Sequence, residues 1–180
     1  LVSPSHVIPQ ILAAVAWAAE RGLDLPLVYN TGGYDSVDEG LALLDGVVDI
    51  YMPDMKYADR ETARRLSLVP DYPEVNQAAV KEMHRQVGDL VLDERGLAVR
   101  GLLVRHLVLP GGLAGTREIM RFLATEVSPD TFVNLMDQYY PAYRAWDHPP
   151  LDRRLRAREW RAAVRAAREA GLHRLYGLTD

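Results

Sequence analysis

The chain alternates between apolar segments of strand length and amphipathic segments of helix length, and this alternation constrains its fold more than any other feature. Strands are expected at residues 25–29, 47–52, 102–109 and 131–136, and helices at 6–21, 36–44, 59–66, 72–87, 116–126 and 156–170. A strand, a polar loop and a helix in repetition predict an α/β fold, with parallel strands and outer helices. A complete eight-unit barrel takes about 250 residues, so 180 residues predict a partial (β/α) barrel fragment.

The length is that of one ordinary domain, and we expect residues 1–180 to form a single domain. Residues 88–101 interrupt the rhythm, because two short apolar runs flank Glu94-Arg-Gly96, and this pattern predicts a small hairpin-like insertion. Residues 156–180 are expected to form a closing amphipathic helix and a tail.

Composition excludes several classes of function. The net charge is −4, so no global basic field predicts binding to nucleic acid or to an anionic membrane. The chain has no cysteine, which removes disulfides, thiol nucleophiles and a cysteine-held cluster from these 180 residues. We also expect no secretory signal, because no long apolar region follows the first residues. No apolar stretch approaches the roughly 20 residues that cross a bilayer, so we expect a cytoplasmic protein.

Polar clusters follow the predicted strands. Asn30-Thr31, Asp54 with Lys56, the turn at 110–115, and residues 137–139 each come directly after an apolar run. In parallel α/β folds the carboxyl ends of the strands carry the chemistry. The sequence therefore predicts a small-molecule site at this edge.

Asp54 and Lys56 allow more than one interpretation. At spacing i, i+2 both side chains can point to one face and hold a zwitterionic or anionic substrate. Lys56 can instead form a Schiff base with Asp54 as proton shuttle, as in a barrel lyase or aldolase. A solvated ion pair, or a non-catalytic domain that binds a ligand or a partner protein, is the alternative without catalysis.

Two further features concern the third of these strands. Arg105 and His106 interrupt an apolar run, and we expect one of the two to face the mouth of the sheet. The glycine-rich turn at 110–115 lacks the spacing of a phosphate loop, so we expect a turn in which Thr116 caps the next helix.

Several longer segments resemble radical S-adenosylmethionine proteins, in the branch related to pyruvate formate-lyase activating enzyme. These are Leu27-Val-Tyr-Asn-Thr-Gly-Gly-Tyr34, Asp49-Ile-Tyr-Met-Pro-Asp-Met-Lys56 and Val104-Arg-His-Leu-Val-Leu-Pro-Gly-Gly112. Residues 72–75, 81–88 and 134–139 are similar to the same branch. The resemblance covers nearly the whole chain.

The resemblance implies a partial barrel that holds S-adenosylmethionine and a [4Fe–4S] cluster. It implies reductive cleavage of S-adenosylmethionine to generate a radical, an oxidoreductase activity, with a glycyl radical enzyme or another protein as partner. The cofactor-binding residues that it implies are Asn30, Thr31, Asp54, Lys56, Arg105, Leu107, Gln138 and Tyr139.

Individual roles follow from the same resemblance. The residues from Asn30 to Lys56 surround the methionine moiety, Arg105 makes a polar contact, and Leu107 contacts the adenine. Thr31, Met52 and Asp54 form a possible monovalent cation site, although Asn30 replaces a carboxylate of the family there. Gln138-Tyr139 stand where relatives carry a histidine.

The chain departs from the family in what it lacks. It has neither the C-x-x-x-C-x-x-C loop nor the Gly-Gly-Glu stretch, so we expect the carboxyl-terminal half of such an enzyme, with no cofactor bound to this chain alone and no catalytic residue in it. The amino-terminal half of the barrel is then a missing partner. The strand at 25–29 would present an unpaired edge, which predicts self-association.

Overall fold

The computed structural model describes residues 1–176 and forms two compact units. The first unit contains Leu1–Pro53 and Val75–Leu103, and the second contains Asp54–Glu74 and the described residues from Val104 onward. Strand β4 (Ala98–Leu107) contributes to both units. The prediction of a single domain stays a prediction.

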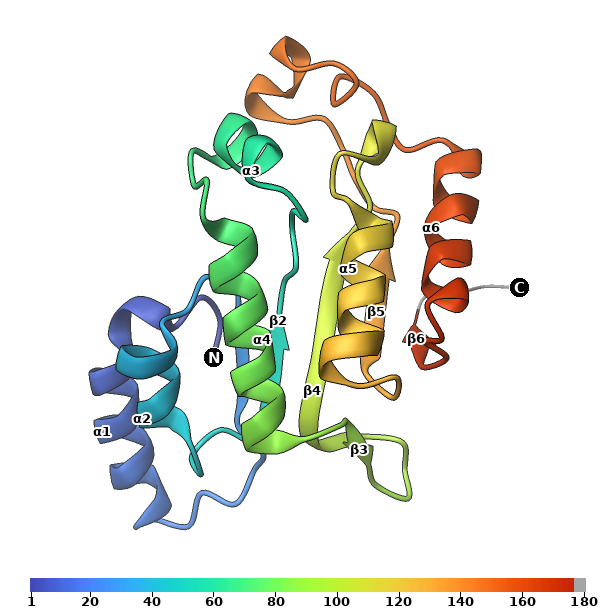
Figure 1. Ribbon diagram of the computed structural model, residues 1–180. Coiled ribbons are helices and arrows are strands. Elements are labelled where there is room, and N and C mark those ends of the chain that lie inside the picture. The colour runs from blue at the N-terminus through green and yellow to red at the C-terminus, as the bar shows by residue number, and fades with distance from the viewer. Residues whose placement is uncertain (177–180) are drawn as a thin grey trace. The chain divides into compact units, whose positions relative to one another are not determined.

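The first unit is built on parallel strands. Strand β1 (Val28–Thr31) pairs in parallel with β2 (Ile50–Pro53), and β2 pairs in parallel with the first half of β4. Helix α1 (Ile8–Ala19) follows a 3-10 turn at Ser5–Val7. Helix α2 (Ala42–Leu44) follows a π-helical turn at Val37–Leu41. Most of helix α4 (Tyr72–Val87) also belongs to this unit. Helices α1 and α2 lie side by side (Figure 1).

The second unit repeats this α/β arrangement. The second half of β4 neighbours β5 (Phe132–Met136), and β5 pairs in parallel with β6 (Leu175–Tyr176). Helix α5 (Thr116–Phe122) continues as a π-helical turn at Leu123–Val127 and packs beside α6 (Ala157–Glu169) (Figure 1). Helix α3 (Arg60–Ser67) and 3-10 turns at Pro110–Gly112 and Tyr143–Asp147 complete the unit. Residues 177–180 of the expected tail lie outside the described part of the chain.

The α/β class with parallel strands and flanking helices is thus confirmed, and helix-capping residues explain two of the helix starts. Ser36 Oγ accepts a hydrogen bond from the Glu39 amide at 3.2 Å, and Asp59 Oδ1 accepts one from the Thr62 amide at 2.8 Å. Within residues 1–176 no helix combines the length and the apolar character that a bilayer span requires.

Strand β4 is longer than expected. The sequence predicted a strand at 102–109 that follows the insertion at 88–101, but one strand runs from Ala98 through Gly101 to Leu107. Gly101 has a φ of +113°, and a Cβ there would collide with the carbonyl oxygen of Asp89. A glycine is therefore needed at this position, and it lets the strand continue where a side chain would end it.

A short hairpin lies within residues 88–101. Strand β3 (Val91–Leu92) pairs antiparallel with the start of β4, and the Asp93 amide donates to the Leu97 carbonyl at 2.8 Å. The carboxylate of Asp93 also accepts from the amides of Arg95 and Leu97, both at 2.9 Å, and thereby stabilises the turn.

The first strand differs from the expectation in position and in pairing. It begins at Val28 rather than Leu25, because Pro26 has no amide to donate and Leu25 is 70% exposed. We expected the edge of this strand to be unpaired, but part of it is paired. Ser3 N donates to Asn30 O at 2.8 Å, and Asn30 N donates to Leu1 O at 2.9 Å. The premise of a bare edge is wrong at Asn30, while self-association stays a prediction.

The core of the first unit contains a buried carboxylate held by hydroxyl groups. Asp35 is 3% exposed and accepts from Ser5 Oγ at 2.5 Å, Tyr29 OH at 3.0 Å and Thr31 Oγ1 at 2.7 Å. Burial raises the pKa of the Tyr29 phenol, so that its hydroxyl stays a donor. Asp35 therefore ties the first helical turn to β1 and to the loop after it.

We expect Asp35→Ala to lower the free energy of unfolding by at least about 2 kcal/mol, because it removes the acceptor of three hydroxyl groups. The matched control Asp24→Ala removes an exposed carboxylate and is expected to change stability by less than about 0.5 kcal/mol. Urea unfolding of the full chain measures both. Equal losses in the two variants would contradict a structural role for Asp35.

Candidate functional site

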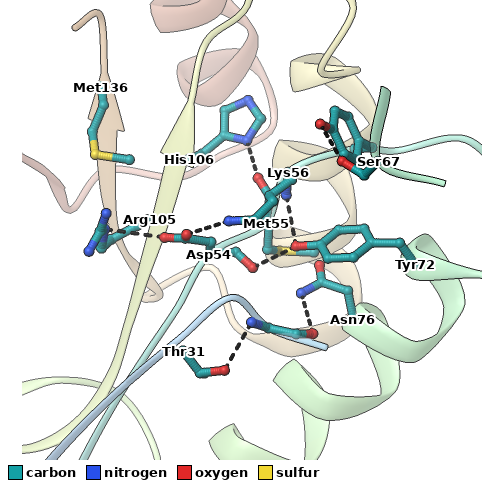
Figure 2. Close-up of polar contacts among 12 residues, drawn as sticks. Thr31, Asp54, Met55, Lys56, Ser67, Tyr72, Asn76, Arg105, His106 and Met136 are labelled. Atoms are coloured by element: carbon teal, nitrogen blue, oxygen red, sulfur yellow. Dashed lines mark hydrogen bonds and ion pairs between the residues drawn. The ribbon is translucent and has the colours of Figure 1, made fainter. Parts of the chain in front are cut away.

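A pocket of about 160 Å³ lies in the second unit, where β4 and β5 end. Asp54 and Lys56 reach it from the segment that follows β2, and Arg105 reaches it from β4. Figure 2 shows Arg105 and Asp54 facing each other. The lining residues are Asp54, Met55, Lys56, Tyr57, Arg105, Leu107, Leu109, Met136 and Gln138.

The charged part of the pocket is one carboxylate between two cations. Asp54 Oδ2 lies 2.5 Å from Lys56 Nζ, and Asp54 Oδ1 lies 3.3 Å from Arg105 Nε. The side chains of Asp54 and Arg105 are 22% and 28% exposed, and that of Lys56 is 42% exposed. The cluster carries a net charge of one positive unit and remains accessible, so it suits an anionic or zwitterionic group.

The rest of the pocket is mostly apolar. Leu107, Leu109 and Met136 form this part of the lining, and the exposed amide of Gln138 provides a further polar group. An apolar lining with a few polar groups is the usual composition of a small-molecule site. The arrangement can bind a molecule that has a charged end and an apolar body.

His106 supports the pocket from the interior of the unit. It is fully buried, and its Nδ1 lies 2.7 Å from the carbonyl oxygen of Met55 while its Nε2 lies 2.9 Å from Thr116 Oγ1. Burial lowers the pKa of His106 from 6.5 to about 4, so the ring is neutral near pH 7. Of the two neighbours Arg105 and His106, Arg105 lines the pocket and His106 is buried.

The expected capping role of Thr116 is wrong. Helix α5 begins after Gly115, which has a φ of +68°, and no side chain caps it. Thr116 is buried, and its hydroxyl is used by the imidazole of His106 instead. The hydrogen bond between Thr116 and His106 satisfies a ring nitrogen in the core, where an imidazole without hydrogen-bond partners would lower the stability of the fold.

Five of the residues expected to bind a cofactor line this one pocket: Asp54, Lys56, Arg105, Leu107 and Gln138. Tyr139 does not line it. Its ring packs against an apolar cluster of Leu109, Ala114 and Leu151, and its hydroxyl donates to the Leu151 carbonyl at 2.7 Å. Sequence reasoning missed the other four lining residues, because nothing distinguishes them from core residues. These are Met55, Tyr57, Leu109 and Met136.

The remaining expected site residues belong to the first unit. Asn30 of β1 is opposite Met52 of β2, and Thr31 is opposite Pro53. The hydroxyl of Thr31 donates to Asp35 at 2.7 Å and accepts from the Gly33 amide at 3.2 Å. The predicted cation site of Thr31, Met52 and Asp54 stays a prediction.

A second cavity, of about 260 Å³, lies beside the glycine-rich turn and α6. Its Glu159 carboxylate accepts from Arg153 at 2.8 and 2.9 Å and from the Gly111 amide at 2.9 Å. The hydrogen bonds from Arg153 lower the pKa of Glu159 to about 2. The Glu159 carboxylate is therefore already used in hydrogen bonds to Arg153 and to the glycine-rich turn, which is a structural role. For this reason we place the candidate site in the pocket of Asp54.

Within residues 1–176, no three histidine, aspartate or glutamate side chains are grouped so that they could hold a metal ion. The sequence contains no cysteine, so it offers no thiolate.

No protein-family model matches the chain. The chain is 32% identical over 169 residues to an uncharacterized protein, MJ0674, of Methanocaldococcus jannaschii. The match covers 93% of this chain and 45% of that protein, so the chain spans less than half of its relative's length. The name of the relative assigns no chemistry, and the function has to be inferred from the site.

We expect the buried His106 to make the protein less stable in acid. Its pKa is lower in the folded chain than the ordinary value of 6.5, so the unfolded chain takes up the proton first. The contribution of His106 to the free energy of unfolding is fully present above pH 6.5 and is lost as the pH falls toward 4. At pH 5 the loss is about 2 kcal/mol.

Urea unfolding at pH 7.5 and pH 5 measures this effect. His106→Asn should remove that part of the pH dependence, whereas the matched control His6→Asn, at an exposed position, should keep it. An unchanged pH dependence in His106→Asn would show that the ring is not buried in its neutral form.

Proposed function

We propose that the chain is the carboxyl-terminal part of a radical S-adenosylmethionine enzyme resembling pyruvate formate-lyase activating enzyme, and that the pocket of Asp54 binds part of S-adenosylmethionine. The observation that carries the proposal is the carboxylate of Asp54 between Lys56 and Arg105, next to an apolar lining. A partial barrel and a cytoplasmic location belong to the same proposal.

The chemistry of the pocket fits this ligand. An α-amino acid group carries an ammonium, which suits Asp54, and a carboxylate, which suits Lys56 and Arg105. The apolar lining suits the methylene groups and the adenine. A pocket of about 160 Å³ is smaller than the ~300–1,000 Å³ of typical ligand sites, so it has room for only part of the molecule. The proposal therefore assigns the rest of the site to residues outside this pocket.

The [4Fe–4S] cluster does not fit the residues present. Such clusters are held by cysteine thiolates, and the chain has none. We therefore propose that the cluster ligands lie outside these 180 residues and that this chain is inactive alone. The chain spans only 45% of the length of its relative, and this supports the proposal that the functional protein is larger. The proposed partners are the amino-terminal half of the barrel and a glycyl radical enzyme or another protein substrate.

The lyase alternative has less support. A Schiff-base lysine attacks as a neutral amine, usually in a desolvated place. Lys56 is instead 42% exposed and ion-paired with Asp54.

We expect the chain to bind S-adenosylmethionine weakly, with chemical-shift changes at Asp54–Lys56, Leu107 and Gln138 in an NMR titration. Asp54→Asn and Arg105→Gln should each weaken binding about tenfold or more, because each removes a charge-assisted contact. Arg95→Gln breaks a similar ion pair with Asp93 in the hairpin and should leave binding unchanged. Absence of shifts at millimolar ligand, or shifts confined to other residues, would contradict the proposed pocket.

We also expect anaerobic reconstitution with iron and sulfide to leave the chain without a stoichiometric cluster, because no thiolate is available. Absorbance and iron content measure the outcome, with a cysteine-containing ferredoxin as positive control. A full cluster on this chain would refute the assignment of the cluster ligands to another segment.

A further inference from the structure

The backbone of residues 54–56 is held by side chains from two other elements. Tyr72, the first residue of α4, donates its hydroxyl to the Asp54 carbonyl at 3.0 Å and accepts from the Lys56 amide at 3.1 Å (Figure 2). His106 of β4 bonds the Met55 carbonyl at 2.7 Å. Both side chains are buried, with 4% and 0% of their surface exposed, and neither lines the pocket.

The backbone of Arg105 in β4 also contacts this segment. The Met55 amide donates to the Arg105 carbonyl at 2.9 Å, and Asp54 pairs with Arg105 in a parallel bridge. Four consecutive backbone groups therefore have hydrogen-bond partners: the Asp54 carbonyl, the Met55 amide, the Met55 carbonyl and the Lys56 amide. A segment fixed in this way has little freedom to reorient the side chains that it carries.

His106 is oriented uniquely by its two partners. The Met55 carbonyl can only accept, so Nδ1 carries the proton, and Nε2 must accept from the Thr116 hydroxyl. The same geometry would allow Thr116 to act as a nucleophile with His106 as its base. A pKa of about 4 makes the ring too weak a base for this at neutral pH, so a supporting role accounts better for the contacts.

We propose that Tyr72 and His106 are positioning residues, which fix the main chain at residues 54–56 so that the carboxylate of Asp54 meets Lys56 and Arg105 in the pocket. The inference rests on the proposed function for its ligand, but the positioning of the charged cluster is measurable without one. Small displacements of supporting groups are sufficient to weaken a site strongly.

The chain offers an internal readout, because Lys56 and Lys81 are its only lysines. Competitive acetylation followed by mass spectrometry gives the reactivity of Lys56 relative to that of the exposed Lys81. Contact with Asp54 protects Lys56 in the wild type. Tyr72→Phe and His106→Phe should raise the reactivity ratio about threefold to tenfold, toward the value of Asp54→Asn.

Two matched variants separate positioning from a general loss of stability. Tyr51→Phe removes a buried hydroxyl that bonds Gln86 in the first unit, and it should leave the ratio unchanged. His106→Asn keeps a donor near the place of Nδ1 and should restore most of the wild-type ratio relative to His106→Phe. An unchanged ratio in Tyr72→Phe and His106→Phe, or an equal rise in Tyr51→Phe, would overturn the inference.

The ligand provides the second readout. Tyr72→Phe should raise the dissociation constant for S-adenosylmethionine about tenfold, while the Tyr51→Phe variant should bind as the wild type does. Wild-type affinity in a Tyr72→Phe variant with raised Lys56 reactivity would overturn the positioning role. If the wild-type chain binds no S-adenosylmethionine, the proposed function fails, and the acetylation ratios alone decide the inference.

Discussion

The hydrogen bonds to the backbone of residues 54–56 are the interaction on which the candidate site depends. The chain leaves β2 there with two charged side chains, and without support such a segment would be an ordinary mobile loop. Tyr72 and His106 supply that support from buried positions, at distances between 2.7 and 3.1 Å. The pocket therefore combines accessible charges with a rigid base, which is the combination that preorganised binding requires.

Each unit contains a buried polar group that several hydrogen bonds satisfy. In the first unit three hydroxyl groups surround the carboxylate of Asp35, and in the second a carbonyl and a hydroxyl surround the ring of His106. Each cluster joins segments that are distant in the sequence, since Ser5 reaches Asp35 and Met55 reaches His106. The cost of an unpaired polar group in the interior makes such clusters specific connections between elements.

Part of the candidate site could be predicted from the sequence. Asp54, Lys56 and Gln138 follow predicted strands, whose carboxyl ends meet at one edge of a parallel sheet. Arg105 interrupts an apolar strand, and Leu107 was expected only from the family resemblance. Asp54, Lys56, Arg105, Leu107 and Gln138 do line one pocket. Tyr139 and Thr116 show the limit of such reasoning. Each has a hydroxyl at a strand end or helix start, and each uses it to satisfy a group inside the second unit.

The α/β class and the order of the main helices and strands could be predicted from the sequence, because hydrophobic periodicity is a local property of the chain. The cap that we predicted at Thr116 was wrong. Three features could not be predicted from the sequence: β4 runs unbroken through Gly101, the segment Leu1–Ser3 pairs with Asn30, and His106 is buried while Arg105 lines the pocket. These outcomes depend on strand register and on which buried donor finds which acceptor. Both are settled by packing between segments that are far apart in sequence.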